Sequence, residues 1–279
     1  MISPKDYDAY CFDLDGTIYI GDQLLPGVKE TLDIIRANNK KILFITNSPT
    51  LTRREGKERL EQFGIDADLE EVITAPYLAA IYFTGVTERA SVFVIGEQAI
   101  KEEFENHSIQ TTENPMEATH VLVGLDRTFT YNGLHMAMNA VRHCGKLIVT
   151  NPDPVCPVPG GFIPDTMSLA KAIEIASDKK IDKVIGKPYD TYGNKMIELL
   201  GVARDRILVI GDRLETDIQL GKTKEFATCL VLTGISTEKD VQTSHIKPDY
   251  IIKNVGSLFQ SDQRDRNRGP FLVDETECV

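Results

Sequence analysis

The sequence is short of positive charge: 31 Lys and Arg stand against 42 Asp and Glu, so the formal net charge is −11. A nucleic-acid-binding surface needs a basic face, and this balance therefore argues against a nucleic-acid partner. Long apolar runs are also missing, since none approaches the roughly 20 residues of a membrane-spanning helix. We expect no nucleic-acid partner and no membrane-spanning segment.

Cysteine is scarce and unpatterned. The five thiols show neither a C-x-x-C pair nor the spacing of a zinc site, and they lie at Cys11, Cys144, Cys156, Cys229 and Cys278. We interpret them as reduced structural thiols, as in a reducing compartment. The opening residues, MISPKD, show no apolar signal-peptide core. We therefore expect a cytoplasmic protein.

What the chain does contain is an alternation of short apolar runs with amphipathic segments. β-branched, nearly continuous hydrophobic runs are typical of parallel strands buried on both faces. Between them, Val28, Leu32 and Ile35 recur at helical spacing before Asn38 and Asn39 end the pattern. This alternation predicts an α/β fold with a doubly wound parallel sheet. The strand-like runs are residues 9–12, 41–46, 92–95, 120–123, 147–150, 183–185, 206–210, 228–232 and 250–252.

These runs are too numerous for one sheet of ordinary size, which predicts a second α/β unit. In residues 80–180 only Asn151 follows a strand-like run with a side chain of the kind that binds ligands. We interpret this stretch as an inserted α/β domain, and residues 1–79 together with 181–260 as a discontinuous catalytic core. The polar, aperiodic residues 261–279 predict a flexible tail.

The strongest chemical signal is DLDGT, residues 13–17, directly after the first strand-like run. Ligands of α/β folds bind at the carboxyl ends of strands, and there Asp13 and Asp15 would repel each other and any phosphate unless a cation joined them. Mg²⁺, a hard cation that prefers oxygen ligands, is the natural partner. Gly16 permits a sharp turn and Thr17 adds a hydroxyl. Taken alone, the same residues also fit a turn with two solvated acids.

Two further strand ends carry polar side chains that suit a phosphate. Thr46 and Asn47 end the second run, where hydroxyl, amide and backbone N–H groups can hold phosphate oxygens. A helix cap is the alternative at that place. Lys187 follows residues 183–185 in the segment GKP and can neutralise the charge of a phosphate or nucleophile. A surface lysine fits that position equally well.

A second acidic pair follows residues 206–210 in the segment VIGDRLETD. Asp212 comes directly after the buried run and can complete a magnesium site begun by Asp13. Asp217 lies near the start of a helix, where acids also act merely as caps.

In this order, the segments DLDGT, ITNS, IGKP and VIGDRLETD resemble the four motifs of the haloacid-dehalogenase-like (HAD) phosphatases. The chain is most similar to the NagD-like, nitrophenylphosphatase-like subfamily, subclass IIA. Within it, residues 80–180 resemble a type C2 cap, and NPD at 151–153 resembles a feature of that cap. The chain departs from many relatives at residues 164–167, PDTM, where they carry a glycine-rich turn after the proline. The resemblance implies a Rossmann-like core with an inserted α/β cap.

The resemblance further implies a hydrolase, a Mg²⁺-dependent phosphatase that works through an aspartyl-phosphate. Asp13 would be the nucleophile, and Asp15 would protonate the leaving oxygen and later activate water. The metal would be bound by Asp13, by the backbone carbonyl of Asp15 and by Asp212. Thr46 and Asn47 would hold the transferring phosphoryl group.

The remaining groups complete this expectation. Lys187 would offset the phosphoryl charge. Thr17 and Asp217 would support the residues that contact the substrate and the metal, with Asp217 orienting either a metal-bound water or Lys187. A roof formed by the insertion favours small phosphorylated metabolites, sugar phosphates first and nucleoside monophosphates second. The proline-rich residues 151–165 are the stretch expected to touch the substrate. We also expect that two copies can pair through the inserted domain.

Other functions share part of this chemistry. A phosphotransferase or mutase would use the same nucleophile and pass the phosphoryl group to another acceptor. A phosphorylatable signalling receiver also combines acids, magnesium and a lysine on a parallel sheet, but it would need neither Asp15 nor an insertion. A dehalogenase would not need magnesium, so Asp15 together with Asp212 argues against it.

Overall fold

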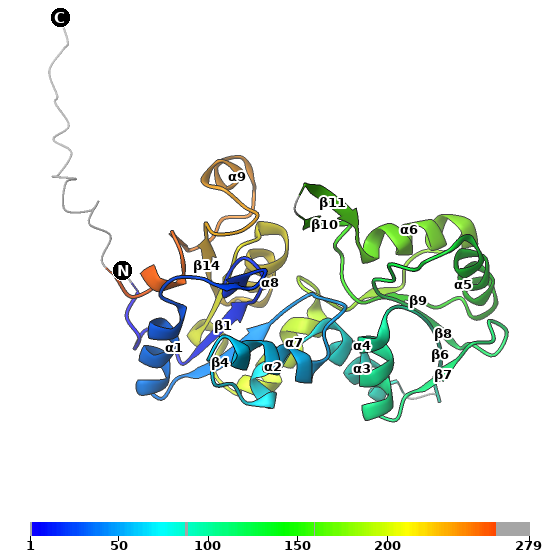
Figure 1. The fold of residues 1–279 in the computed structure, drawn as a ribbon, viewed down its shortest axis with the longest axis horizontal. Helices are drawn as coiled ribbons and strands as arrows, with labels where there is room; N and C mark the ends of the chain where they lie inside the picture. Colours follow the sequence, from blue (N-terminus) through cyan, green and yellow to red (C-terminus); the bar gives the residue numbers. More distant parts are fainter. Residues whose placement is uncertain (1, 87–88, 159, 261–279) are drawn as a thin grey trace, which may run out of the picture.

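The computed structural model describes residues 2–86, 89–158 and 160–260, and in this part of the chain two large parallel sheets lie next to each other (Figure 1). The first sheet has the strand order β15-β14-β13-β1-β4-β5. Its strands are β1 Ala9–Asp13, β4 Lys41–Ile45, β5 Val72–Ile73, β13 Ile207–Gly211, β14 Ala227–Val231 and β15 Tyr250–Ile252. The expected tail, residues 261–279, lies outside the described residues.

The second sheet is also parallel, with the order β12-β9-β8-β6-β7. Its strands are β6 Ser91–Ile95, β7 Gln110–Thr112, β8 His120–Val123, β9 Leu147–Val149 and β12 Lys183–Val184. One expectation was wrong here. Residues 183–185 were predicted to belong to the core sheet, but Lys183 pairs with Ile148 and Val184 with Val149. Strand β12 therefore lies in the second sheet, beyond the boundary expected at residue 180.

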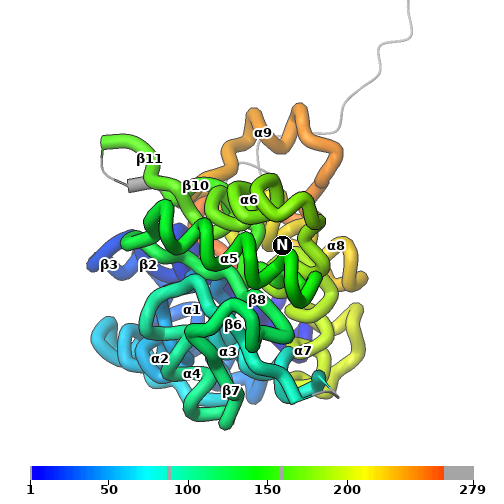
Figure 2. The backbone as a smooth tube through the Cα atoms, turned by 90° about the vertical axis from the view of Figure 1, so that its right-hand side faces the viewer, coloured from blue at the N-terminus to red at the C-terminus, as the bar shows by residue number. Residues whose placement is uncertain are grey.

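Helices cover both faces of each sheet. They are α1 Val28–Ala37, α2 Arg53–Gln62, α3 Ala75–Thr84, α4 Gln98–Asn106, α5 Tyr131–Cys144, α6 Thr166–Ser177, α7 Asp190–Leu200, α8 Gln219–Lys224 and α9 Glu238–Thr243. Figure 2 looks onto α5 and α6, whose apolar side chains pack on one face of the second sheet. The predicted α/β fold with doubly wound parallel sheets is confirmed, because helices cover the faces of parallel strands.

Short elements complete the description. Two antiparallel hairpins, which the sequence did not reveal, project near the sheets: β2 Tyr19–Ile20 with β3 Gln23–Leu24, and β10 Val155–Val158 with β11 Gly161–Pro164. Single turns of helix occur at Leu69–Glu71, Arg204–Arg206, Leu214–Ile218 and Val255–Ser257. Within the described ranges, no helix combines the length and apolar character needed to cross a bilayer.

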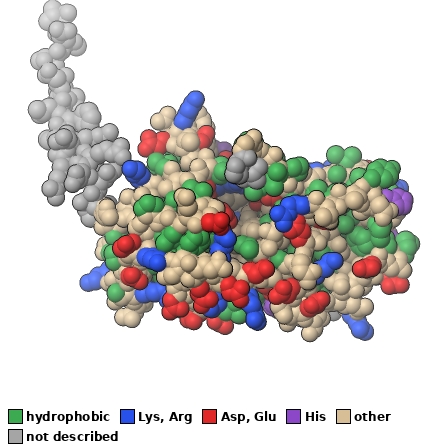
Figure 3. All heavy atoms as spheres, in the orientation of Figure 1, with side chains coloured by type: hydrophobic (Ala, Val, Ile, Leu, Met, Phe, Trp, Pro, Cys, Tyr) green, Lys and Arg blue, Asp and Glu red, His purple; other side chains and the backbone are tan. Residues whose placement is uncertain are grey.

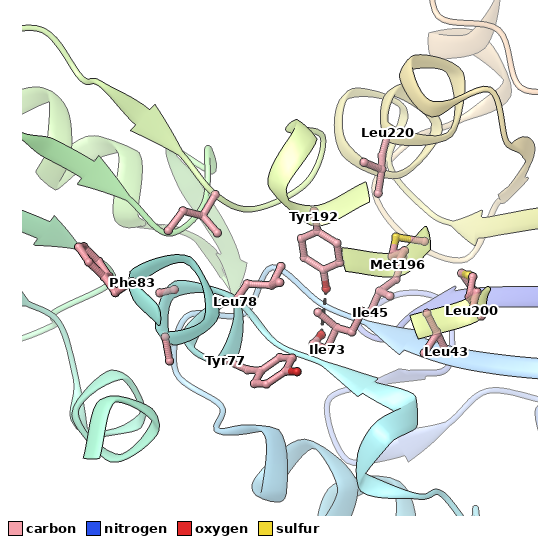
Figure 4. Packing of buried hydrophobic residues seen from close by; sticks show 14 of the residues in the cluster. Leu43, Ile45, Ile73, Tyr77, Leu78, Phe83, Tyr192, Met196, Leu200 and Leu220 are labelled. Atoms are coloured by element: carbon pink, nitrogen blue, oxygen red, sulfur yellow. Dashed lines mark hydrogen bonds between the residues drawn. The ribbon is translucent and has the colours of Figure 1, made fainter. Parts of the chain in front are cut away.

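One buried cluster joins the two sheets. It runs from core-sheet residues such as Ile45 and Ile73, through α3 and α7, to Leu122 and Ile148 of the second sheet. Figure 4 shows Tyr192 of α7 within this cluster, its hydroxyl pointing at the carbonyl of Ile73. Because the packing is continuous, the second sheet is held in place against the first, and the strand ends of both meet one cavity.

Candidate active site

The cavity lies at the carboxyl ends of the core strands. Asp13 ends β1, Thr46 follows β4, and Asp212 follows β13, so parallel pairing brings these side chains to one edge of the sheet. Parallel α/β sheets bind their ligands at this edge. The cavity measures about 590 Å³ and is lined from the second unit as well, by residues that include Asn151, Asp153, Val155, Cys156 and Asp165.

Lys187 occupies the floor of this cavity and is almost completely buried. Its Nζ lies 2.5 Å from Oδ1 of Asp13 and 2.7 Å from Oδ1 of Asp217. Burial alone would lower the pKa of Lys187, but the two carboxylates outweigh burial and raise it, so the side chain keeps its charge. The lysine therefore reaches Asp13 as a cation, although it follows a strand of the second sheet.

Three buried carboxylates could hold a metal. One oxygen each of Asp13, Asp212 and Asp217 lies within 4.8 Å of the others. Burial raises the pKa of Asp13, and the charges of Asp217 and Asp212 add to this while Lys187 opposes it. Burial and Asp217 also raise the pKa of Asp212, to about 6. A set of hard oxygen donors that repel one another fits a small divalent cation.

Asp217, which was not among the expected metal ligands, both contacts Lys187 and belongs to this candidate metal group. The group consists of side-chain oxygens alone, so the role of the Asp15 backbone carbonyl stays a prediction. Asp15 is exposed to the cavity, yet enough protein surrounds it that desolvation raises its pKa, with Arg59 and Lys187 opposing. Thr17 is buried close by in sequence, and its hydroxyl has no hydrogen-bond partner in the described part of the chain.

Asn47 lines the cavity, and its side-chain amide also hydrogen-bonds to the backbone of Lys187 and to Asp153. Its Oδ1 accepts the N–H of Lys187 at 2.8 Å, and its Nδ2 donates to the Lys187 carbonyl at 3.1 Å and to Oδ2 of Asp153 at 3.2 Å. Thr46 is buried, and its Oγ1 accepts the N–H of Ser48 at 2.9 Å. The segment ITNS therefore lines the cavity and also positions Lys187 in the segment IGKP.

One ion pair crosses from one unit to the other, between Asp153 of the NPD segment and Arg213, to which the sequence analysis gave no role. Arg213, directly after Asp212, donates from Nη1 to Oδ1 of Asp153 on the loop after β9. Asp153 also accepts from Asn151 at 2.9 Å. The acids Asp212 and Asp217 made this motif recognisable in the sequence. The pairing of Arg213 with Asp153 could not be predicted, because the two residues are 60 positions apart.

A loop after β14 was missed too. Ile235 donates its N–H to Oδ2 of Asp212 at 2.7 Å, and Ser236 donates to the Asp212 carbonyl at 2.9 Å. A Cβ added to Gly234 would lie only 1.8 Å from Oδ2 of Asp212. Gly16, with a φ of +83°, lets the DLDGT turn approach the same carboxylate. The available signal was a further polar residue at a strand end, Thr233, which follows the run 228–232.

Comparison with known proteins places this geometry in a family. Residues 10–110 match the family model of haloacid dehalogenase-like hydrolases, and residues 184–258 match that of HAD-hydrolase-like proteins. The acid sugar phosphatase of Staphylococcus epidermidis is 32% identical over 251 residues, which is 90% of this chain and 96% of that protein.

Solved structures agree. 4-Nitrophenylphosphatase from Thermotoga maritima has a TM-score of 0.87 at 32% identity, and NagD from Escherichia coli has 0.82 at 25%; each covers 92% of this chain and 98% of the other. Glycerol phosphate phosphatase from Mycobacterium tuberculosis, solved in complex with magnesium, has a TM-score of 0.84 at 27% identity and covers 92% of this chain and 78% of the other. The chain therefore belongs to the haloacid dehalogenase-like hydrolases, and it is a phosphatase of their NagD-like and nitrophenylphosphatase-like branch.

Proposed function

We propose that this phosphatase hydrolyses phosphate monoesters of small metabolites with the help of Mg²⁺, sugar phosphates first and nucleoside monophosphates second. The observation that carries the proposal is the placement of Asp13. Its carboxylate lies at the cavity floor, 2.5 Å from the Lys187 ammonium and beside the carboxylates of Asp212 and Asp217. A carboxylate so placed is a nucleophile with its charge partners already assembled.

In the proposed reaction, an oxygen of Asp13 attacks phosphorus while the bond from phosphorus to the ester oxygen breaks. Lys187 offsets charge on the transferring phosphoryl group, and the hydroxyl of Thr46 with the backbone N–H of Asn47 holds its oxygens. Asp15 gives its proton to the departing ester oxygen and then takes one from the water that attacks the aspartyl-phosphate. This water splits the acyl-phosphate, releases inorganic phosphate and restores Asp13.

The acidic floor supports the metal requirement. Asp13, Asp212 and Asp217 would hold the ion, together with the backbone carbonyl of Asp15. When bound, Mg²⁺ would neutralise charge on the phosphoryl oxygens and on the carboxylates around them. Ile235 and Ser236 keep Asp212 in one position through backbone hydrogen bonds, so this ligand does not have to reorganise. The magnesium complex of the Mycobacterium tuberculosis relative supports the same choice of ion.

The substrate class follows from the roofed cavity and from the relatives. A volume of about 590 Å³, closed in part by the loop that carries Asp153 and by the β10–β11 hairpin, suits a metabolite rather than a phosphoprotein. Relatives that act on sugar phosphates, glycerol phosphate and nitrophenyl phosphate support this choice.

A screen of about a hundred phosphorylated metabolites against the metal-loaded protein tests the proposal, with released phosphate as the readout. We expect turnover of sugar phosphates and of nitrophenyl phosphate, and its loss when a chelator removes the metal. Full activity in thoroughly metal-stripped protein, or a preference for phosphoproteins, would contradict the proposal. Product analysis with an added alcohol distinguishes hydrolysis from transfer to another acceptor.

A further inference from the structure

The cavity holds many carboxylates and few cations. Its described lining includes six Asp side chains but only two cationic ones, Lys187 and Arg213. Lys187 already contacts Asp13 and Asp217, and Arg213 is paired with Asp153. Lys187 cannot move to a second anionic group on a substrate without weakening buried ion pairs, which is costly, and the charge of Arg213 is already opposed by the carboxylate of Asp153.

Helix α6 begins at the cavity wall, and its first N–H groups are already occupied. The N–H of Thr166 donates to Oδ1 of Asp165 at 2.5 Å, and that of Ser168 donates to the Asp165 carbonyl at 3.0 Å. Between them, the N–H of Met167 donates to the carbonyl of Asp153 at 2.9 Å. A helix N-terminus is normally a ready anion site. In this chain the N-terminal N–H groups of α6 are already hydrogen-bonded within the protein, and the carboxylate of Asp165 takes the place of an external anion.

Asp165 also lines the cavity, and it is 7% exposed. Burial raises the pKa of Asp165, and hydrogen bonds from Thr166 and Asn151 lower it. Cys156, Asp165 and the proposed proton donor Asp15 all line this cavity. A leaving group that departs toward Asp15 therefore shares the cavity with the carboxylate of Asp165.

We propose that Asp165 determines specificity: it favours esters whose leaving group is uncharged and hydroxylated, and it rejects those whose leaving group carries a second anion. The inference rests on the proposed function and names its substrate class more closely. A hydroxyl can donate to the acceptor oxygens of Asp165, whereas a carboxylate or second phosphate meets a like charge. Within the described lining, both cations are already paired with carboxylates, which reduces what they can contribute against that repulsion.

Glycerol 1-phosphate and 3-phosphoglycerate test this directly, because the main difference between them is a hydroxymethyl group in one and a carboxylate in the other. We expect the wild-type kcat/KM to favour glycerol 1-phosphate by about tenfold or more. Asp165→Asn keeps an acceptor that caps α6 but removes the charge. It should cut the ratio about tenfold, mainly by raising turnover of 3-phosphoglycerate. Asp165→Ser is a second capping variant with the same expectation.

Glu215→Gln is the matched control. It removes one negative charge from an exposed residue near Asp212 that does not line the cavity, so the ratio should stay at its wild-type value. Because the readout is a ratio within one protein, partial loss of folded protein cancels.

Three results overturn the inference while leaving phosphatase function intact: a wild-type ratio near one, a ratio unchanged in both Asp165 variants, or an equal change in Glu215→Gln. If the wild-type protein with Mg²⁺ hydrolyses neither ester nor nitrophenyl phosphate, the proposed function itself fails.

Discussion

The side chain of Asn47 makes two hydrogen bonds to the backbone of Lys187. Its Oδ1 accepts from the Lys187 N–H at 2.8 Å, and its Nδ2 donates to the Lys187 carbonyl at 3.1 Å. Asn47 follows a strand of the first sheet, whereas Lys187 follows a strand of the second. The position of the lysine that faces Asp13 is thus set by a residue of the other unit. Positioning of this kind matters in phosphoryl transfer, where the protein mostly orients groups and offsets charge.

Replacing Asn47 with Ala should lower kcat by about 10- to 100-fold, because a displacement of the lysine by about 1 Å costs that much in a preorganised site. Steady-state kinetics with nitrophenyl phosphate measures the effect. Asn132→Ala, at an exposed position on α5, is the control and should behave like wild type. Wild-type kcat in the Asn47 variant would show that Lys187 holds its place without this clamp.

Asp13→Asn should abolish turnover, by at least about a thousandfold, because the amide cannot form the aspartyl-phosphate. Far-ultraviolet circular dichroism should show an intact fold. A fluoride-based phosphate mimic that traps the wild-type site should also fail to bind. Retention of substantial activity by purified Asp13→Asn would mean that another group attacks phosphorus.

Much of the fold follows from local pattern. The runs at 41–46, 120–123 and 206–210 became buried strands, because continuous apolar sequence suits strands covered on both faces. The sheet to which residues 183–185 belong could not be predicted. An apolar run is the same in either sheet, and only its pairing with β9 decides the matter. The hairpins β2–β3 and β10–β11 are too short to leave a periodic signal.

The candidate site shows the same limit. Asp13, Lys187 and Asp212 were predictable because each stands beside an apolar run at a strand end. The role of Arg213 was not, since its partner Asp153 is 60 residues away and a charged residue beside a motif is ordinarily solvated. Figure 3 illustrates the difficulty: Asp and Glu side chains gather along the lower part of the face shown, and composition does not distinguish the acids of the candidate site from these.

The Arg213–Asp153 ion pair links the loop after β13 to the loop after β9, so it should contribute to stability across the two units. We expect Arg213→Met and Asp153→Asn each to lower the free energy of unfolding by about 1–3 kcal/mol, since each removes one charge of a largely buried, charge-assisted hydrogen bond. The double variant should lose less than the sum of the two. Urea unfolding of all four proteins measures this, and strict additivity would mean that the pair is not coupled.

Gly234 lies against the carboxylate of Asp212, and this contact gives the sharpest test of the metal site. A Cβ at Gly234 would come within 1.8 Å of Oδ2, where the Ile235 N–H already holds the carboxylate, so Asp212 must move. We expect Gly234→Ala to raise the Mg²⁺ concentration for half-maximal activity by about 10- to 100-fold, the range seen when groups that orient a metal ligand are lost.

Gly85→Ala is the matched control for this change, because a Cβ there meets the carbonyl of Tyr82 only at an ordinary 3.5 Å and lies away from the cavity lining. Its Mg²⁺ requirement should equal that of the wild type. Magnesium titrations of activity, with isothermal titration calorimetry of metal binding as a readout independent of turnover, decide the question. If Gly234→Ala binds and uses Mg²⁺ as the wild type does, Asp212 in its observed position is not the ligand, and the proposed metal centre must be drawn with other residues.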